Sequence, residues 1–344
     1  MNKVKIVAEI GCNHNGDAGL AIKLIDAAAK AGVDAVKFQT FAAEELVSVY
    51  APKAEYQKAN DGAGSQLDMI RRLELTHEEY LETKKHAEEL GIEWFSTGFD
   101  LPSIDFLVSL DQRVWKIPSG EITNLPYLEK IRDIQCADKE IILSTGMSTL
   151  DEIRFATGIL SQSRDTKFTI LHCNTEYPTD DEDMNLLAMN VLADEFPGWE
   201  VGLSDHSTGT VAAVAAVALG ATFIEKHFTL DKSLPGPDHK ASVTPDELAE
   251  LCRSVRRAEV MMGSRGKFVT DSERKNKKVA RKSIVARRAV KAGEIFTVEN
   301  LTCKRPGSGV SPIHWYEVLG TAAERDFEPD ELIEIGGLKP EGNG

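Results

Sequence analysis

The stretch EVGLSDHSTGTVAAVAAVALGATFIEKHFT, residues 200–229, holds one complete unit of a repeating pattern. Its two ends, 200–206 and 222–229, are short and almost continuously apolar, and the run between them is rich in alanine and valine. Nearly continuous apolar strands joined by a helix are typical of a parallel sheet that is buried on both faces. The stretch therefore predicts a strand, a crossover helix and a second, parallel strand.

Strand and helix patterns alternate in this way from the N-terminus up to Gly263. Capping boxes mark helix starts at Thr76–Glu79 and Thr149–Glu152, and a last helix opens at Thr244. Eight strand–helix repeats predict an α/β fold, a (β/α)8 TIM barrel, over residues 1–264. The expected strands are 4–11, 34–40, 92–98, 113–120, 140–146, 168–174, 200–206 and 222–229.

An open, doubly wound sheet is the alternative to the barrel. Such a sheet is expected to carry a glycine-rich first turn that binds a nucleotide. The first turn here, GCNHNG at 11–16, does not match the G-x-G-x-x-G pattern. The barrel is therefore the preferred prediction.

Polar side chains stand at the carboxyl ends of nearly all the expected strands. Packing alone does not explain this, because unpaired buried charges are costly. In a barrel these ends converge on one mouth, where active sites lie. We therefore predict an active site there, with these candidates: Glu9, Lys37, Gln39, Thr97, Lys116, Ser119, Glu121, Ser144, His172, Asn174, His206 and His227.

Part of this set favours a small anion, with phosphate as the natural ligand. Lys37 and Lys116 would supply positive charge, and hydroxyl groups would supply hydrogen bonds. No P-loop is present, so a nucleotide cradle is not indicated. Each hydroxyl has a local backbone hydrogen bond as its alternative role. The hydroxyl residues are Thr97, Ser119, Ser144 and Ser204.

Two histidines form a candidate metal site. His206 and His227 end neighbouring strands, which lie about 4.8 Å apart, so the two imidazoles can share one ion. The positions left for water or substrate oxygens would make that ion a Lewis acid. The alternative ligands are His14, His172 and His239.

Glu9 lies on the strand that adjoins the His227 strand once the barrel closes. Its carboxylate is a candidate general base for a bound water. The alternative role is a salt bridge to Lys37 on the other neighbouring strand.

The adjacent residues Ser204, Asp205 and His206 suggest a hydrolase triad at first sight. Side chains alternate along a strand, so Ser204 and His206 face one way and Asp205 faces the other. No G-x-S-x-G elbow surrounds the serine. The three residues therefore do not predict a hydrolase.

The charge distribution argues against nucleic acid or an anionic membrane as the main partner, since the net charge is −15. Residues 264–288 are the exception, with ten Lys/Arg against two acidic residues. A nucleic-acid patch is one interpretation of this stretch. We prefer a solvated, flexible linker over 265–282, followed by a small β-rich domain over 283–344.

Other features indicate a cytoplasmic protein. No apolar run approaches the ~20 residues of a membrane span, and the N-terminus lacks a secretory signal. The five cysteines are scattered and form no Cys-x-x-Cys, as expected in a reducing compartment.

Long motifs in a fixed order resemble the sialic acid synthase family. The resemblance covers about residues 3–335. It implies the barrel and, after the linker, an antifreeze-like (SAF, β-clip) domain. The motifs are AEIGCNHNGD, VKFQTF, KIPSGEITN, ILSTGM, LHCNTEYPT, GLSDHSTG, EKHFTLDKSLPGPDHKAS and KRPGSG.

The resemblance implies a metal-dependent condensation of phosphoenolpyruvate with N-acetylmannosamine and water, which releases phosphate and gives N-acetylneuraminate. The metal would be Mn²⁺, or else Mg²⁺ or Co²⁺, on His206 and His227, and Glu9 would assist the attacking water. Residues that match the phosphoenolpyruvate site are Lys37, Thr97, Lys116, Ser119, Ser144 and Ser204. Residues that match sugar contacts are Gln39, Glu121, Tyr177 and Asp238.

The resemblance also implies a domain-swapped homodimer, in which Arg305 reaches the sugar of the partner chain. Two alternatives to an N-acetylneuraminate synthase stay open. One is an N,N'-diacetyllegionaminate synthase, which uses 2,4-diacetamido-2,4,6-trideoxymannose. The other is a non-catalytic carbohydrate-binding protein.

Overall fold

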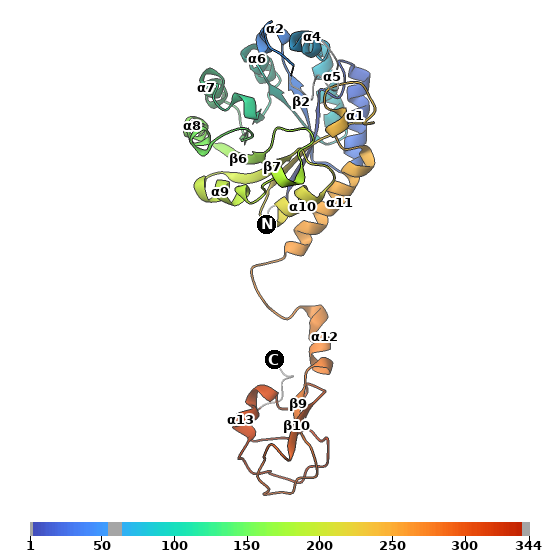
Figure 1. The fold of residues 1–344 in the computed structure, drawn as a ribbon, viewed down its shortest axis with the longest axis vertical. Helices are drawn as coiled ribbons and strands as arrows, with labels where there is room; N and C mark the ends of the chain where they lie inside the picture. Colours follow the sequence, from blue (N-terminus) through green and yellow to red (C-terminus); the bar gives the residue numbers. More distant parts are fainter. Residues whose placement is uncertain (1–2, 54–63, 339–344) are drawn as a thin grey trace. The chain divides into compact units, whose positions relative to one another are not determined.

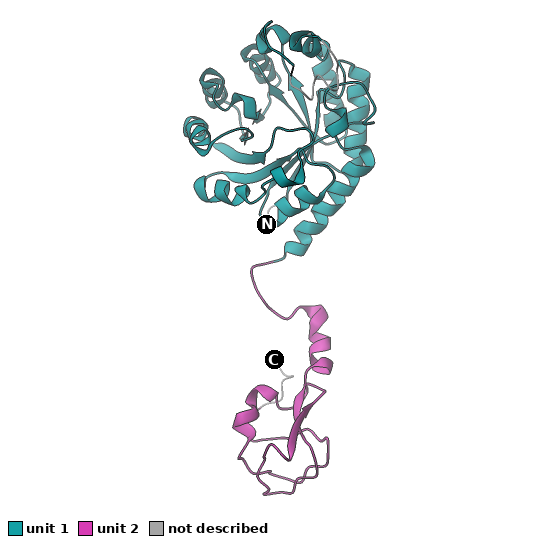
Figure 2. Cartoon of the chain, viewed as in Figure 1, with its two compact units in different colours: residues 1–263 teal, residues 264–344 magenta. Residues whose placement is uncertain are grey.

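The computed structural model describes residues 3–53 and 64–338. The chain forms two compact units, Met1–Gly263 and Ser264–Gly344 (Figure 2). Each unit has a hydrophobic core of its own, which is the mark of separate domains.

Eight parallel strands form the inner ring of the first unit, and helices pack around that ring (Figure 1). Hydrogen-bonded ladders join the neighbours from β4 through β8 and β1 to β3, and β3 lies in contact with β4. The predicted TIM barrel is therefore confirmed. The strands are β1 (Lys5–Gly11), β2 (Ala35–Thr40), β3 (Glu93–Gly98), β4 (Val114–Ile117), β5 (Lys139–Ser144), β6 (Thr166–Cys173), β7 (Glu200–Asp205) and β8 (Phe223–His227).

Local sequence signals fix the helix ends. Thr76, Thr149 and Thr244 each form a capping box with a glutamate three residues on. Gly32 ends α1 with φ at 92°, a left-handed conformation that favours glycine. The helices are α1 (Ala18–Ala31), α2 (Ala43–Leu46), α4 (Gln66–Arg71), α5 (His77–Glu89), α6 (Leu101–Ser109), α7 (Leu125–Asp133), α8 (Leu150–Leu160), α9 (Ala188–Glu195), α10 (Val211–Ala218) and α11 (Pro245–Met262), with 3-10 turns η1 (Ser119–Glu121), η2 (Asp181–Asp183) and η3 (His239–Ala241).

Two apolar layers stabilise the barrel. One packs the strands against the helices, and the other fills the barrel interior. Because strand side chains alternate, residues two positions after the interior layer face the same interior, one step nearer the carboxyl-terminal mouth. The interior layer consists of Val7, Ala35, Phe95, Val114, Ile142, Leu171 and Phe223.

The second unit opens with helix α12 (Asp271–Ala280), inside the segment predicted as a flexible linker. Thr270 and Glu273 form a capping box, and Lys277 and Lys278 stand in the last turn, where basic charge suits the helix dipole. Part of the segment predicted as a solvated linker is therefore helical, and no residue of this helix is buried.

Beyond α12 the second unit is a small β-rich domain. Strand β9 (Ser283–Ala286) pairs antiparallel with β10 (Leu301–Lys304), and α13 (Trp315–Val318) packs on the same core. In the described parts of both units, no helix combines the length and apolar character needed to cross a bilayer. All five cysteines are free thiols.

Candidate active site

A cavity of about 430 Å³ opens at the carboxyl-terminal mouth of the barrel. Every strand, or the loop directly after it, contributes to its lining. This is where the sequence predicts the active site, and most of the candidates line it. The predicted residues among the lining are Lys37, Gln39, Lys116, Ser119, Ser144, Tyr177, Ser204, His206, His227 and Asp238.

The floor of the cavity is a network of buried ion pairs. Lys37 Nζ lies 2.7 Å from Glu9 Oε2 and 3.8 Å from Glu225 Oε2, and Lys116 Nζ lies 3.3 Å from Glu225 Oε1. The Ser204 hydroxyl donates to Glu225 Oε1 at 3.1 Å. Both lysines therefore already have carboxylate partners inside the protein.

The pKa values of the two floor carboxylates, Glu225 and Glu9, shift in opposite directions. Burial alone would raise the pKa of Glu225, but the charges of Lys116 and Lys37 outweigh it and bring the value to about 2. Burial dominates at Glu9 and raises its pKa to about 7, against the pull of Lys37. Burial lowers the pKa of Lys116. Glu225 therefore holds the permanent negative charge of the floor.

Glu225 is a site residue that the sequence prediction missed. It stands two positions before His227 on β8, so both side chains face the barrel interior. The interior layer residue Phe223 belongs to the same series. Strand alternation counted back from His227 would have found it, but the prediction named only His227 on this strand.

The hydroxyl groups divide into two sets. Ser144, Ser119 and Ser204 line the cavity. The buried Ser144 Oγ has no hydrogen-bond partner within the described residues, so it is available to a ligand. Ser119 Oγ accepts the N–H of Gly146 at 2.9 Å. Thr97 is different, because it is fully buried outside the lining, with Oγ1 3.5 Å from Lys37 Nζ.

Glu9 also lies beneath the cavity and not in its wall. The side chain is fully buried and outside the lining. Gln39 Nε2, which does line the cavity, donates to Glu9 Oε1 at 2.7 Å. The salt bridge to Lys37, the alternative to a general base, is present in the structure.

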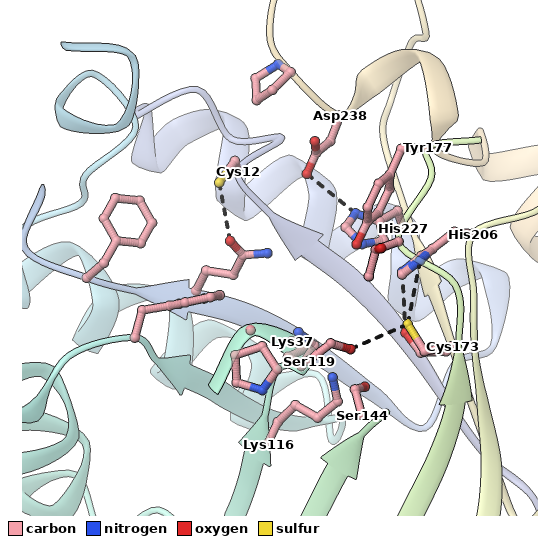
Figure 3. Close-up of a pocket in the computed structure, with 18 of the residues that line it drawn as sticks. Cys12, Lys37, Lys116, Ser119, Ser144, Cys173, Tyr177, His206, His227 and Asp238 are labelled. Carbon is pink, nitrogen blue, oxygen red and sulfur yellow. Dashed lines mark hydrogen bonds and ion pairs between the residues drawn. The ribbon is translucent and has the colours of Figure 1, made fainter. Parts of the chain in front are cut away.

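The two histidines stand side by side at the rim, with Tyr177 against them (Figure 3). The ring centroids of His206 and His227 are 5.1 Å apart. His206 Nδ1 lies 2.5 Å from the Asn174 carbonyl oxygen, so it carries the proton and donates. The second nitrogen, Nε2, lies 3.4 Å from Ser204 Oγ. Burial and the neighbouring His206 charge lower the pKa of His227, which keeps this imidazole neutral.

This pair has the chemistry of a partial metal site. Imidazoles with one nitrogen oriented by a carbonyl, as His206 Nδ1 is by Asn174, are common ligands of divalent metals. Within residues 3–53 and 64–338, no set of three His, Cys, Asp or Glu side chains is arranged to hold an ion. A metal bound here would therefore take its other ligands from water or substrate.

The alternative histidine ligands are engaged elsewhere and lie outside the lining of the cavity. His14 Nδ1 accepts the N–H of Gly16 at 3.1 Å, and burial lowers its pKa to about 4. His172 Nε2 donates to the Met184 carbonyl at 2.7 Å. His239 Nδ1 lies 2.7 Å from Thr229 Oγ1.

The residues predicted to contact a sugar are only partly brought together. Gln39, Tyr177 and Asp238 line the cavity, and Asp238 Oδ2 lies 3.7 Å from His227 Nδ1. Glu121, on η1, is outside the lining and accepts from Asn124 at 2.6 Å. Arg305 belongs to the second unit, where its Nε donates to the Ala280 carbonyl.

Asp205 faces away from the cavity, as alternation predicts. Its carboxylate pairs with Lys226 Nζ at 2.8 Å and accepts the Ser207 N–H at 2.9 Å. Ser204 and His206 point the other way, into the cavity. A triad made of these three neighbours is therefore excluded.

Comparison with known proteins agrees with this architecture. The NeuB family model matches residues 24–267, and the SAF domain model matches residues 281–338. The N,N'-diacetyllegionaminic acid synthase of Campylobacter jejuni is 49% identical over 336 residues, which covers 97% of this chain and 99% of that protein. The enzyme of the same name from Legionella pneumophila is 46% identical over 323 residues, covering 92% and 89%.

More distant relatives also match most of the chain. Human N-acetylneuraminate-9-phosphate synthase is 35% identical over 340 residues, covering 97% of this chain and 94% of that protein. Among solved structures, the N-acetylneuraminic acid (sialic acid) synthetase of Leptospira borgpetersenii in complex with citrate is 34% identical, with a TM-score of 0.71 and coverage of 80% and 90%. The chain thus belongs to the NeuB family of sialic acid synthases and is an enzyme with a C-terminal SAF domain.

Proposed function

We propose that the protein is an N,N'-diacetyllegionaminic acid synthase that condenses phosphoenolpyruvate with 2,4-diacetamido-2,4,6-trideoxymannose and water. The identities of 49% and 46% to two enzymes of that name, against 35% to a sialic acid 9-phosphate synthase, carry this choice of sugar. They favour it over N-acetylmannosamine, the sugar expected first from the sequence motifs.

The floor of the cavity is suited to the phosphate and carboxylate of phosphoenolpyruvate. Lys37 and Lys116 provide charge, and the Ser144 hydroxyl provides a donor without an internal partner. Ser119 and Ser204 complete the set. In the reaction, carbon 3 of phosphoenolpyruvate forms a bond to the sugar aldehyde carbon, water adds at carbon 2, and phosphate leaves from the tetrahedral intermediate. Donors fixed around the phosphate stabilise the charge at each stage.

Glu9 takes a different role from the general base predicted from the sequence. It is fully buried outside the lining of the cavity, and its carboxylate contacts Lys37 and Gln39. Its ion pair with Lys37, at 2.7 Å, instead positions that ammonium and keeps it protonated. Thr97 supports the same ammonium from below.

A divalent metal, Mn²⁺ first and Mg²⁺ or Co²⁺ as alternatives, would be held by His206 and His227 and would polarise the sugar aldehyde as a Lewis acid. The carbonyl of Asn174 orients the His206 ring, and the ring centroids of the two histidines are 5.1 Å apart, which supports this assignment. Tyr177 and Asp238, which adjoin the pair, would orient the sugar beside it.

Replacing His206 by alanine is expected to weaken Mn²⁺ binding by at least about 10-fold, since losing an outer-shell partner alone costs about 10–100-fold. Isothermal titration of the metal-free protein with Mn²⁺ measures this directly. His172→Ala is the matched control, because His172 bonds the Met184 carbonyl outside the cavity and should leave the affinity unchanged. Equal Mn²⁺ affinity in His206→Ala and the wild type would refute the metal assignment.

The choice of sugar is tested by phosphate release from phosphoenolpyruvate with each candidate sugar. We expect kcat/KM for 2,4-diacetamido-2,4,6-trideoxymannose to exceed that for N-acetylmannosamine by about 10-fold or more. Fast turnover of N-acetylmannosamine without turnover of the diacetamido sugar would make the protein an N-acetylneuraminate synthase. Sugar binding without phosphate release would instead support the carbohydrate-binding alternative.

We further propose the homodimer implied by the family resemblance, with Arg305 of one chain serving the barrel of the other. Within its own unit, Arg305 bonds the Ala280 carbonyl through Nε only, which leaves its remaining guanidinium nitrogens for a partner. A monomer with full activity, seen by light scattering at assay concentration, would contradict this proposal.

A further inference from the structure

One side of the cavity contrasts with the polar floor and rim. Six apolar side chains form it, from the ends of β2 and β3 and from helices α2 and α4 that follow β2. We name this surface the apolar wall. It comprises Phe41, Leu46, Met69, Ile70, Leu73 and Phe99.

The apolar wall is built before any ligand arrives. Phe41 and Phe99 meet edge to face at 6.4 Å. Phe41 and Leu73 are also buried in one cluster with Cys12, which stands apart from the histidine pair (Figure 3). Leu46 and Ile70 are half-buried and pack against that cluster. The wall therefore offers a fixed apolar surface with no side-chain donor or acceptor.

Polar contacts on the outside hold the two short helices of the wall together. Arg71 on α4 donates to Glu44 on α2 at 2.6 Å. Glu74, just after α4, accepts the N–H of Ala43 at 2.5 Å. The Ser65 hydroxyl caps the start of α4. The apolar side chains on the inner side are therefore kept in place by groups that do not face the cavity.

We propose that the apolar wall selects the 6-deoxy end of the sugar, the methyl group at carbon 6, against sugars with a hydroxyl there. This inference rests on the proposed function. The histidine pair and the apolar wall form two different sides of the cavity. The sugar aldehyde at carbon 1 belongs beside His206 and His227, so carbon 6, at the other end of the sugar, points away from them. The acetamido groups carry N–H and C=O groups that need polar partners, which leaves the terminal methyl as the part suited to the wall.

The selection has a simple physical origin. A methyl group on the wall keeps its apolar contacts, whereas a hydroxyl there would lose water without gaining a partner. Discrimination of this kind in an apolar pocket amounts to about 10- to 100-fold in kcat/KM. Ile70 and Leu46 are the members to vary, since each is only half-buried and lies on a separate helix.

The test compares two sugars that differ only at carbon 6: 2,4-diacetamido-2,4,6-trideoxymannose and 2,4-diacetamido-2,4-dideoxymannose. In the wild type, kcat/KM is expected to favour the deoxy sugar by about 10- to 100-fold. Ile70→Asn should lower this ratio by about 10-fold, through a higher KM for the deoxy sugar, with KM for phosphoenolpyruvate unchanged. Leu46→Asn repeats the test from α2. Leu67→Asn is the matched control on α4, half-buried outside the cavity, and should keep the wild-type ratio.

The outcomes separate the inference from the proposed function. A wild-type ratio near one, or an unchanged ratio in both Ile70→Asn and Leu46→Asn, would overturn the inference while turnover of the diacetamido sugars upholds the proposed function. Failure of the wild type to use either diacetamido sugar would overturn the proposed function itself. A ratio that falls equally in Leu67→Asn would assign the effect to helix α4 as a whole and also overturn the inference.

Discussion

Replacing Lys116 by methionine is expected to lower kcat/KM for phosphoenolpyruvate by about 10²–10³-fold, the usual cost of removing one fixed donor that stabilises developing charge. Lys116 is one of two cations in the cavity floor, and it forms an ion pair with Glu225 at 3.3 Å. Methionine keeps most of the side-chain volume and removes the charge. The rate of phosphate release at saturating sugar, measured at several phosphoenolpyruvate concentrations, gives this kcat/KM.

A surface lysine provides the control for this substitution. Lys130 pairs with Asp105 on the outside of the barrel, so Lys130→Met should leave the kinetics unchanged. Retention of kcat/KM within about threefold in Lys116→Met would show that this ammonium does not stabilise the reaction.

Replacing Glu225 by glutamine is expected to reduce the free energy of unfolding by about 3–5 kcal/mol. The change keeps the shape and the Ser204 hydrogen bond, but it leaves two buried lysines with a single carboxylate, Glu9. Breaking a buried pair on one side is costly because the remaining charge is uncompensated. Urea unfolding followed by tryptophan fluorescence measures the change, since three of the four tryptophans, Trp94, Trp115 and Trp199, lie in the barrel unit.

Glu195 gives a matched comparison for Glu225. It pairs with Arg154 at 2.7 Å on the surface, so Glu195→Gln should cost at most about 1 kcal/mol. If Glu225→Gln lowered the free energy of unfolding by less than about 1 kcal/mol, water or a rearranged lysine side chain would already compensate the positive charge of the floor.

The fold was predictable from the sequence because its main signals are local and repeated. Apolar runs of strand length, capping boxes at Thr76 and Thr149, and the stop at Gly263 each act within a few residues. Eight repetitions leave few topologies that bury all the strands. The helix α12 was missed because its basic composition was taken as a sign of flexibility, although Thr270 and Glu273 form a capping box there.

The sequence predicted which way the side chains of the candidate site point, but not which of them reach the cavity. Alternation correctly turned Ser204 and His206 toward the cavity and Asp205 away from it. The distance of each side chain from the cavity opening depends on the register between neighbouring strands. The sequence of a single strand does not contain this register. Glu9 and Thr97 are therefore fully buried outside the lining, although they pair in register with Lys37 and Gln39, which line the cavity.

The apolar wall was also not predictable from the sequence. Half of its residues come from the two short helices after β2, where no strand period applies. Leu46 and Ile70 stand on these helices, which pack against each other beside the cavity. Residues of this kind become visible only in the folded chain.

The ion pairs of the floor also decide how an anion is captured. Glu225, ionised between Lys37 and Lys116, offsets one of the two positive charges of the floor, and Glu9 offsets the other when it is ionised. The protein as a whole carries −15, so its long-range field repels phosphoenolpyruvate instead of steering it inward. The proposed capture of phosphoenolpyruvate at this floor is consequently an exchange of partners at short range, in which the ligand takes over contacts that the carboxylates held. Raising the ionic strength therefore weakens a repulsion and not an attraction.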